Sequence, residues 1–360
     1  SSSTMYDVLQ TNDTPSPDTD LLHESLRREI ERSLRTLTAR EGDVVRLYFG
    51  LNGEHPLTLE EIGERFDLTR ERVRQIENYA LANIRKADVY KTEKAAFDHL
   101  EENIHTLGGI VLEADLLSHM SKDVSTQNHI NFLLSLHESF KKRKEDEHFE
   151  HRWHVNEELA QKVEDSLHKL YSNLADDDLL QESEMIQAFL EHVEGVSEKY
   201  KNQEILKRWL SISKKIGKNA LGEWGVSNSS NIKTKGMRDY AFLVIRKHGS
   251  PIHFREVAKN IEKIFKKKAH VATCHNELIK DPRFVLVGRG LYALKEWGYA
   301  SGVVRDVIKN IIEKNGPLTK DQVVEKVLKE RYVKENTIMV NLQNQKYFKK
   351  DREGRYSIAA

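Results

Sequence analysis

The segment from Thr58 to Lys86 constrains the fold most, because its apolar residues have the spacing of two helices joined by a tight turn. Leu59, Ile62 and Phe66 recur at offsets of three and four, so a helix starting after Thr58 buries them on one face. Gly63 is expected to let another helix approach closely. The pattern therefore predicts a helix-turn-helix whose first helix has a packing face.

The second helix of this segment is predicted to follow a turn at Asp67 and Leu68, with Thr69 as its N-cap. Its inward stripe is Val73, Ile76 and Leu81. Its outward side chains are Arg70, Glu71, Arg72, Arg74 and Gln75. A polar first turn can enter a DNA major groove, where Arg suits guanine, Glu accepts from cytosine and Gln pairs with adenine.

The stretch from Leu26 to Glu77, LRREIERSLRTLTAREGDVVRLYFGLNGEHPLTLEEIGERFDLTRERVRQIE, resembles region 4 of primary bacterial sigma factors. In that family the module reads the promoter −35 element and sits on the RNA polymerase β-flap. The resemblance implies two partners, double-stranded promoter DNA and the polymerase core. It implies base contacts by Arg70, Glu71 and Gln75, and phosphate or activator contacts by Arg72 and Arg74, with the cap Thr69 beside them.

The residues before this stretch, from Met5 to Glu24, resemble the acidic linker that precedes region 4 in primary sigma factors. They are rich in Pro, Asp and Thr, so we expect disorder. Nothing in the chain resembles sigma region 2, which melts the −10 element. The chain alone is therefore not expected to open a promoter.

Charge is divided unevenly along the chain. Lysine plus arginine equal aspartate plus glutamate, 57 against 57. Residues 231–360 hold 28 basic against 14 acidic residues, a charge of +14, whereas residues 1–230 hold 29 against 43, a charge of −14. A positive charge this concentrated is typical of nucleic-acid binding, which we expect in the last third of the chain.

An internal repeat occupies this basic part, where Asp239–Leu294 and Val303–Ile358 have the same order of segments. Each copy has a helix that ends at a glycine, a proline shortly after it, two further helices and a closing hairpin. The hairpin turns are Gly288–Gly290 and Asp351–Gly354. Three helices and a two-stranded wing predict a winged helix.

The copy Asp239–Leu294 resembles the HARE-HTH family on the letters KHGSPIHFREVAKNI and RFVLVGRGLYAL. That family occurs in RNA polymerase delta subunits, in chromatin factors and beside restriction endonucleases. The resemblance implies DNA contact by the third helix and wing, although the delta subunit uses its domain to bind polymerase. The implied contact residues are Lys266, Lys267, Lys268, His270, Thr273, His275, Arg283 and Arg289.

The middle of the chain is more weakly patterned. Residues 107–155 repeat the order helix, helix, hairpin, and the mixed charges of their turn, Lys144–Glu147, favour a protein-contact or spacer role. Residues 156–216 have the apolar spacing of three amphipathic helices, the third running from Ile205 to Ile216. Ser227–Lys235 is predicted to be an exposed linker.

No enzyme signature is complete. Gly217–Glu223 has the glycine spacing of a phosphate loop but lacks its Lys and Ser/Thr, so a helix C-cap and turn is expected. His148, His151 and His154 alternate faces of an expected hairpin and do not converge on a metal. Cys274, the single cysteine, is expected to be buried and fits a reducing cytoplasm. We expect no catalysis, no cofactor and no metal.

The sequence predicts a mainly α, multidomain protein with a helix-turn-helix and tandem winged-helix domains that carry short β-hairpin wings. No apolar run of about 18 residues and no signal peptide is visible, so we expect a cytoplasmic, nucleoid-associated bacterial protein. The expected parts are a disordered acidic linker (1–24), a sigma region 4-like helix-turn-helix (25–91), a degenerate winged helix (92–155), a helical connector (156–226), a HARE-HTH-like winged helix (235–298) and a second winged helix (300–360).

The expected function is that of a DNA-binding transcription factor of the sigma-factor type, which reads a −35-like element while its basic domains contact flanking DNA or polymerase. The alternative is a delta-like polymerase accessory factor that modulates initiation without choosing promoters. A third is a specificity module for a separate restriction or repair enzyme. The oligomeric state stays open.

Overall fold

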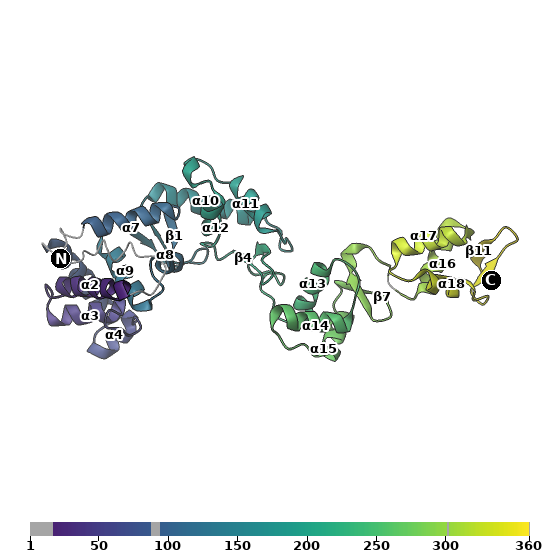
Figure 1. The fold of residues 1–360 in the computed structure, drawn as a ribbon, viewed down its shortest axis with the longest axis horizontal. Coiled ribbons are helices and arrows are strands. Elements are labelled where there is room, and N and C mark those ends of the chain that lie inside the picture. Colours follow the sequence, from purple (N-terminus) through teal and green to yellow (C-terminus); the bar gives the residue numbers. More distant parts are fainter. Residues whose placement is uncertain (1–16, 88–93, 301, 360) are drawn as a thin grey trace. The chain divides into compact units, whose positions relative to one another are not determined.

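The computed structural model describes residues 17–87, 94–300 and 302–359. This part is mainly helical and holds four small sheets (Figure 1). It separates into two compact units: described residues up to 217 with 224–227 form the first, and residues 218–223 with those from 228 onward form the second. None of the described helices is long and apolar enough to cross a membrane.

The first unit begins with the helices α2 (Pro17–Leu34), α3 (Ala39–Phe49), α4 (Leu59–Phe66) and α5 (Arg70–Lys86). Helix α2 begins at Pro17, residues 1–16 lie outside the described part, and the disorder of the acidic segment stays a prediction.

Residues 94–155 form the next group of helices and strands in the first unit, here called module A. Its elements are α7 (Lys94–Thr106), β1 (Ile110–Leu112), α8 (Glu113–Met120), α9 (Val124–Leu136), β2 (Lys141–Arg143) and β3 (Arg152–His154). The sheet order is β1-β3-β2, with Trp153 opposite both Val111 and Lys142. The predicted order helix, helix, hairpin is confirmed, and α7 and β1 precede it.

Helix α9 lies in a hydrophobic core that module A shares with α2, α3 and α5. Its Ile130, Phe132 and Leu133 are buried, as are Ile30 of α2 and Phe49 of α3. The Phe49 and Phe132 rings meet edge to face, 5.4 Å apart. Such a third helix often faces DNA in helix-turn-helix domains, but here protein covers it. This packing supports the predicted protein-contact role of module A.

Hydrogen bonds hold both ends of α9 against the first four helices. At its start, the Arg27 guanidinium donates to the Ser125 hydroxyl at 2.9 Å. At its end, the Arg85 guanidinium donates to the backbone oxygens of Ser135, at 3.1 Å, and of Leu136. The helix is therefore fixed by polar contacts as well as by apolar packing.

Residues 157–226, here called module B, end in a hairpin that the predicted helical connector lacks. The elements are α10 (Glu157–Asn173), α11 (Glu182–Leu190), η1 (Glu198–Tyr200), α12 (Gln203–Leu210), β4 (Ile216–Lys218) and β5 (Trp224–Val226). Helix α12 ends at Leu210, so the helix predicted through Ile216 is too long. Leu180 forms a bridge with Trp224, which gives module B the same order of elements as module A. Strands of three residues are too short to show an alternating pattern.

The segment with the glycine spacing of a phosphate loop lies at this hairpin. The Asn219 side-chain oxygen accepts from the backbone N–H groups of Leu221, at 2.9 Å, and Glu223, at 3.1 Å. The predicted turn is confirmed, but the predicted helix C-cap is wrong because α12 ends earlier. Asn219 also donates to the backbone oxygen of Asn231 at 3.1 Å, so the predicted linker is anchored at a buried residue.

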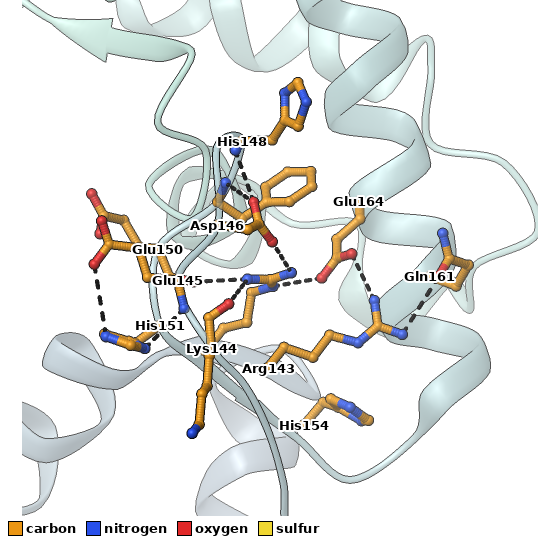
Figure 2. A network of polar contacts seen from close by, with 12 residues as sticks. Arg143, Lys144, Glu145, Asp146, His148, Glu150, His151, His154, Gln161 and Glu164 are labelled. Atoms are coloured by element: carbon orange, nitrogen blue, oxygen red, sulfur yellow. Dashed lines mark hydrogen bonds and ion pairs between the residues drawn. The ribbon is translucent and has the colours of Figure 1, made fainter. Parts of the chain in front are cut away.

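A buried ionic network joins the hairpin of module A to α10 of module B (Figure 2). Arg152 of β3 is 3% exposed and donates to Glu164 at 2.6 Å and to Asp146 at 3.1 Å. Arg143 of β2 donates to the other oxygen of Glu164 at 2.6 Å and forms an ion pair with Glu157. The hairpin of module A therefore contacts protein, as α9 does.

The second unit contains the two predicted repeats, here called module C (residues 237–294) and module D (residues 304–358). Module C has α13 (Met237–His248), β6 (Ile252–His253), α14 (Phe254–Phe265), α15 (Val271–Lys280), β7 (Phe284–Gly288) and β8 (Leu291–Leu294), followed by η2 (Lys295–Trp297). Module D has α16 (Val304–Asn315), β9 (Leu318–Thr319), α17 (Lys320–Glu330), α18 (Glu335–Leu342), β10 (Phe348–Lys350) and β11 (Arg355–Ile358).

Both repeats have the predicted order of helices and hairpin, with one short strand added between the first two helices. The sheet orders are β6-β8-β7 in module C and β10-β11-β9 in module D. Arg331, 3% exposed, joins the modules by donating to the backbone oxygens of Leu286, at 2.8 Å, and Ala300, at 2.7 Å. Modules A to D thus repeat one order of elements.

Candidate nucleic-acid interface

Helix α4 is the first helix of the predicted helix-turn-helix. The Thr58 N–H donates to the Glu61 carboxylate at 2.7 Å, and the Glu61 N–H donates to the Thr58 hydroxyl at 3.2 Å. This capping box starts the helix where the sequence predicts. Ile62 is fully buried, and Leu59 and Phe66 are half-buried in a small core shared with α3 and α5. The predicted packing face is confirmed.

The turn between α4 and α5 depends on Gly63. A Cβ at this position would lie 2.6 Å from the backbone oxygen of Leu68, a separation that Cβ atoms essentially never show. The close neighbour is therefore the turn itself, and not another helix as predicted. The Leu68 N–H donates to the Gly63 oxygen at 2.8 Å, and Asp67 ends α4 in the left-handed conformation at a φ of 53°. Asp tolerates this conformation better than most residues do.

Helix α5 begins at the predicted cap, where the Thr69 hydroxyl accepts from the Arg72 N–H at 3.2 Å. Val73 and Leu81 are buried and Ile76 is half-buried, which confirms the inward stripe. The predicted outward residues are all exposed, and they are Arg70, Glu71, Arg72, Arg74 and Gln75. The structure thus brings the predicted base-contacting and phosphate-contacting side chains together on one free face.

These outward side chains pair with neighbouring side chains. The hydrogen bond from Arg74 lowers the pKa of the Glu71 carboxyl, so Glu71 is a charged acceptor near neutral pH. Exposed pairs of this kind are weak, and contacts with bases and phosphates can replace them. The pairs are Arg70–Glu60 at 2.9 Å, Arg72–Gln75 at 3.2 Å, and Arg74–Glu71 at 2.9 and 2.7 Å.

Comparison with known proteins agrees with this geometry. The family model described as sigma-70, region 4 matches residues 33–86. These residues are a sigma-70 region 4 domain. Domains of this kind bind −35 promoter DNA and the RNA polymerase β-flap. The resemblance to region 4 is confirmed for residues 33–77 of the stretch from Leu26 to Glu77, whereas the HARE-HTH resemblance of module C stays a prediction.

Three curated relatives match over the same part of the chain. The chloroplastic RNA polymerase sigma factor sigD of Arabidopsis thaliana is 46% identical over 82 residues, 23% of this chain and 20% of that protein. The sigma-C factor of Nostoc sp. PCC 7120 is 44% identical over 95 residues, 26% and 22% of the two chains. SigA of Listeria monocytogenes is 46% identical over 79 residues, 22% and 21%. The match spans about a fifth of each relative.

Module C exposes most of its predicted contact residues. Lys266 ends α14 in the left-handed conformation at a φ of 55°, and the lysines after it lie in the segment that leads to α15. Arg289 lies in the turn of the β7–β8 hairpin. The exposed residues of the predicted set are Lys266, Lys267, Lys268, His270, Thr273 and Arg289.

Two residues of the predicted set, His275 and Arg283, are engaged within module C. The His275 ring stacks on the Phe254 ring at 4.0 Å. Arg283 donates to the buried Asp281 at 2.7 Å and to the buried Asp239 at 3.1 Å, and the hydrogen bond with Asp281 raises the pKa of its guanidinium. These contacts join α15 to α14 through His275 and Phe254, and they join the residue before β7 to α13 through Arg283 and Asp239. Both side chains therefore take part in packing within module C, and their contact with DNA stays a prediction.

Cys274 is fully buried in α15, as predicted. Burial raises the pKa of its thiol to about 11, so the reactive thiolate is scarce near neutral pH. We expect Ellman's reagent at mildly alkaline pH to modify the native chain roughly 100-fold more slowly than the urea-unfolded chain. The single cysteine makes the rate specific to module C, and equal rates in the two states would contradict this burial.

The three clustered histidines have separate partners in the structure. Among the described residues, no group of three or more His, Cys, Asp or Glu side chains is arranged to hold a metal ion. The contacts are His148 with the His168 ring at 4.8 Å, His151 with Glu145 at 3.7 Å, and His154 with Glu157 at 3.1 Å.

A cationic cluster in module D was not predicted. The Tyr347 ring has Arg305 at 4.5 Å, Lys309 at 5.7 Å and Lys346 at 5.6 Å from its centre. Arg305 and Lys309 belong to α16, whereas Lys346 follows α18, so the residues are far apart in sequence. The sequence signal that could have indicated this site is an aromatic residue beside lysines, at 345–350.

Proposed function

We propose that the chain is a DNA-binding transcription factor of the sigma-factor type. Region 4 reads a −35-like promoter element through Arg70, Glu71 and Gln75 and contacts RNA polymerase. Modules A to D are winged helices, and the basic modules C and D add contacts to DNA or to polymerase. The observation that carries the proposal is the exposed outward face of α5 in a domain of the region 4 family.

A second candidate is an RNA polymerase accessory factor that modulates initiation without promoter selection. The observation that favours it is the burial of α9 against α2, α3 and α5. Region 4 therefore shares a hydrophobic core with module A, and α9 covers the apolar faces of α2, α3 and α5. Region 4 and module A together can bind polymerase through other surfaces whether or not region 4 chooses a promoter.

The test compares binding of the intact chain to a duplex containing TTGACA and to a scrambled duplex, at two salt concentrations. We expect Arg70→Ala and Gln75→Ala each to reduce the preference for the hexamer by about 1–3 kcal/mol, because each removes a base contact. Affinity for both duplexes should fall with salt, because phosphate contacts release counterions.

The matched control is Lys169→Ala, which removes an exposed cation of α10 that pairs with Glu194 at 3.4 Å. This variant should keep the hexamer preference of the wild type. Equal binding to both duplexes, unchanged by Arg70→Ala and Gln75→Ala, would reject promoter reading and leave the accessory factor as the function.

A further inference from the structure

The segment that connects modules C and D is held at both of its ends. Trp297 and Tyr299, which follow module C, pack against an apolar cluster of the β7–β8 hairpin. The Ala300 N–H then donates to the backbone oxygen of Glu330, the last residue of α17, at 2.7 Å. The segment is therefore fixed on the hairpin of module C at its start and on module D at its end.

Arg331, the residue after α17, joins the same place from the side of module D. Its guanidinium donates to the backbone oxygen of Leu286 in β7 at 2.8 Å and to that of Ala300 at 2.7 Å. The backbone of Tyr332 also lies near the hairpin, since a Cβ at Gly288 would be 3.5 Å from its oxygen. One side chain of module D thus contacts the hairpin of module C and the connecting segment together. We call this set of contacts the C–D joint.

The Arg331 guanidinium is an unusual group to bury at such a joint. The residue is 3% exposed, and no carboxylate of the described residues pairs with it. Its Nε is also buried and meets no acceptor within the described ranges. Burying a charged group costs free energy, so the two backbone oxygens have to offset that cost. A residue of this kind selects one arrangement of its partners more than it adds stability.

The joint between modules A and B has different chemistry. There Arg152 is paired with the carboxylates of Glu164 and Asp146, so its charge is neutralised (Figure 2). The acceptors in the C–D joint are uncharged peptide oxygens from two separate segments. Hydrogen bonds to such oxygens depend on where the backbones lie, and a displacement of roughly 1 Å breaks them. The contacts of Arg331 therefore require one relative position of modules C and D.

We propose that Arg331 is a positioning residue, which holds modules C and D together as one rigid body in the free protein. The hydrogen bonds of the joint meet at this side chain and at Ala300, so without Arg331 module D turns about the connecting segment. The inference goes beyond the proposed function, because the joint is formed with or without a partner.

The rigid joint has a consequence for DNA binding, and this consequence rests on the proposed function. Residues 231–360 carry a charge of +14, and both basic modules belong to this part. Two modules that are already fixed relative to each other lose little further freedom when both bind one continuous duplex. We therefore expect the joint to raise the affinity for a duplex long enough to reach both modules.

Pulsed electron spin resonance measures the joint on the full chain without DNA. Nitroxide labels are attached at Lys247→Cys, near the end of α13, and at Lys314→Cys, near the end of α16, in a Cys274→Ala background. Both labelled positions are exposed. The chain that keeps Arg331 should give one narrow distribution of distances between the labels. Arg331→Met should widen it by about twofold or more, because modules without a firm joint move independently.

Three further variants control this measurement. Lys329→Ala should leave the distribution narrow, since this exposed lysine of α17 pairs with Glu325 at 2.6 Å and takes no part in the joint. Arg331→Lys keeps a charged donor, so its distribution should lie between those of the wild type and Arg331→Met. Ala300→Pro removes the N–H that donates to Glu330 and should widen the distribution as well. If Arg331→Met unfolds module D in circular dichroism, the other two joint variants still test the proposal.

A binding measurement separates positioning from phosphate contact. Arg331→Met should weaken binding to a long duplex by about tenfold, because the two modules no longer bind as one body. The salt dependence of the binding constant should stay the same, because a buried guanidinium neutralises no phosphate. A residue that contacted a phosphate would instead lower this dependence by about one when removed. Lys329→Ala should keep the affinity of the wild type.

Three results would overturn the proposal. The first is a broad distance distribution in the chain that keeps Arg331, which means that the modules move independently. The second is a distribution that stays narrow in both Arg331→Met and Ala300→Pro. The third is a lower salt dependence for Arg331→Met, which would assign Arg331 to phosphate contact. Failure of the proposed function would appear separately, as a narrow distance distribution in a chain that binds no duplex.

Discussion

Replacing Arg152 with methionine is expected to lower the free energy of unfolding of the first unit by about 3–5 kcal/mol. Arg152 and Glu164 are 3% and 6% exposed, and their atoms lie 2.6 Å apart. Arg152 also donates to the backbone oxygens of Lys144, at 3.1 Å, and Glu150, at 3.0 Å. Methionine keeps much of the apolar volume but leaves a buried carboxylate and two backbone acceptors with fewer donors.

Urea unfolding followed by tryptophan fluorescence would measure this change, because Trp153, Trp209 and Trp224 all lie in the first unit. Lys169→Ala on the same α10 helix should change the stability by less than about 0.5 kcal/mol. Arg152→Met/Glu164→Met should be less destabilised than Arg152→Met alone, because the buried Glu164 carboxylate is removed with Arg152 while Arg143 keeps its ion pair with Glu157. A decrease below about 1 kcal/mol for Arg152→Met would show that the network is not essential to the joint.

Replacing Gly63 with valine is expected to abolish the preference of region 4 for its hexamer and to destabilise the domain by about 1–3 kcal/mol or more. The added Cβ would lie 2.6 Å from the Leu68 backbone oxygen, and that atom belongs to the turn that orients α5. The turn has to open to accept it. Opening moves Arg70 and Gln75 relative to α4, and base contacts tolerate little displacement.

The control is Gly236→Ala, because a Cβ there meets nothing within 4 Å. It should leave both stability and DNA preference nearly unchanged. Circular dichroism and the two-duplex binding assay would report the two effects of Gly63→Val separately. A Gly63→Val chain that binds the hexamer as the wild type does would contradict the role of the turn in aiming α5.

Much of region 4 was predictable because its determinants are local. The capping box of Thr58 and Glu61, the cap at Thr69 and the apolar spacing of α4 each act within one or two helical turns. The repeated order of modules C and D was predictable for the same reason, since glycine, proline and hairpin signals follow one another closely. The sequence predicts only helices for module B, because its two strands, β4 and β5, have three residues each.

The contact residues of module C show that a sequence pattern does not predict which side chains from other helices a residue contacts. His275 and Arg283 have the chemistry of DNA-contacting residues, and they lie beside residues that are exposed. Their partners, Phe254 and Asp239, come from α14 and α13. A pattern along one helix cannot show that a ring or a carboxylate from another element already occupies the side chain.

The sequence alone determined that this chain has a region 4 helix-turn-helix with Arg70, Glu71 and Gln75 on its free face, because caps, turn and periodicity are encoded in neighbouring residues. Tertiary structure decided that α9 covers α2, α3 and α5, that Arg152 joins module A to Glu164 of α10, and that cations of α16 meet Lys346 at Tyr347. Periodicity shows which face of a helix is apolar. Which surface covers that face depends on contacts between residues far apart in the chain.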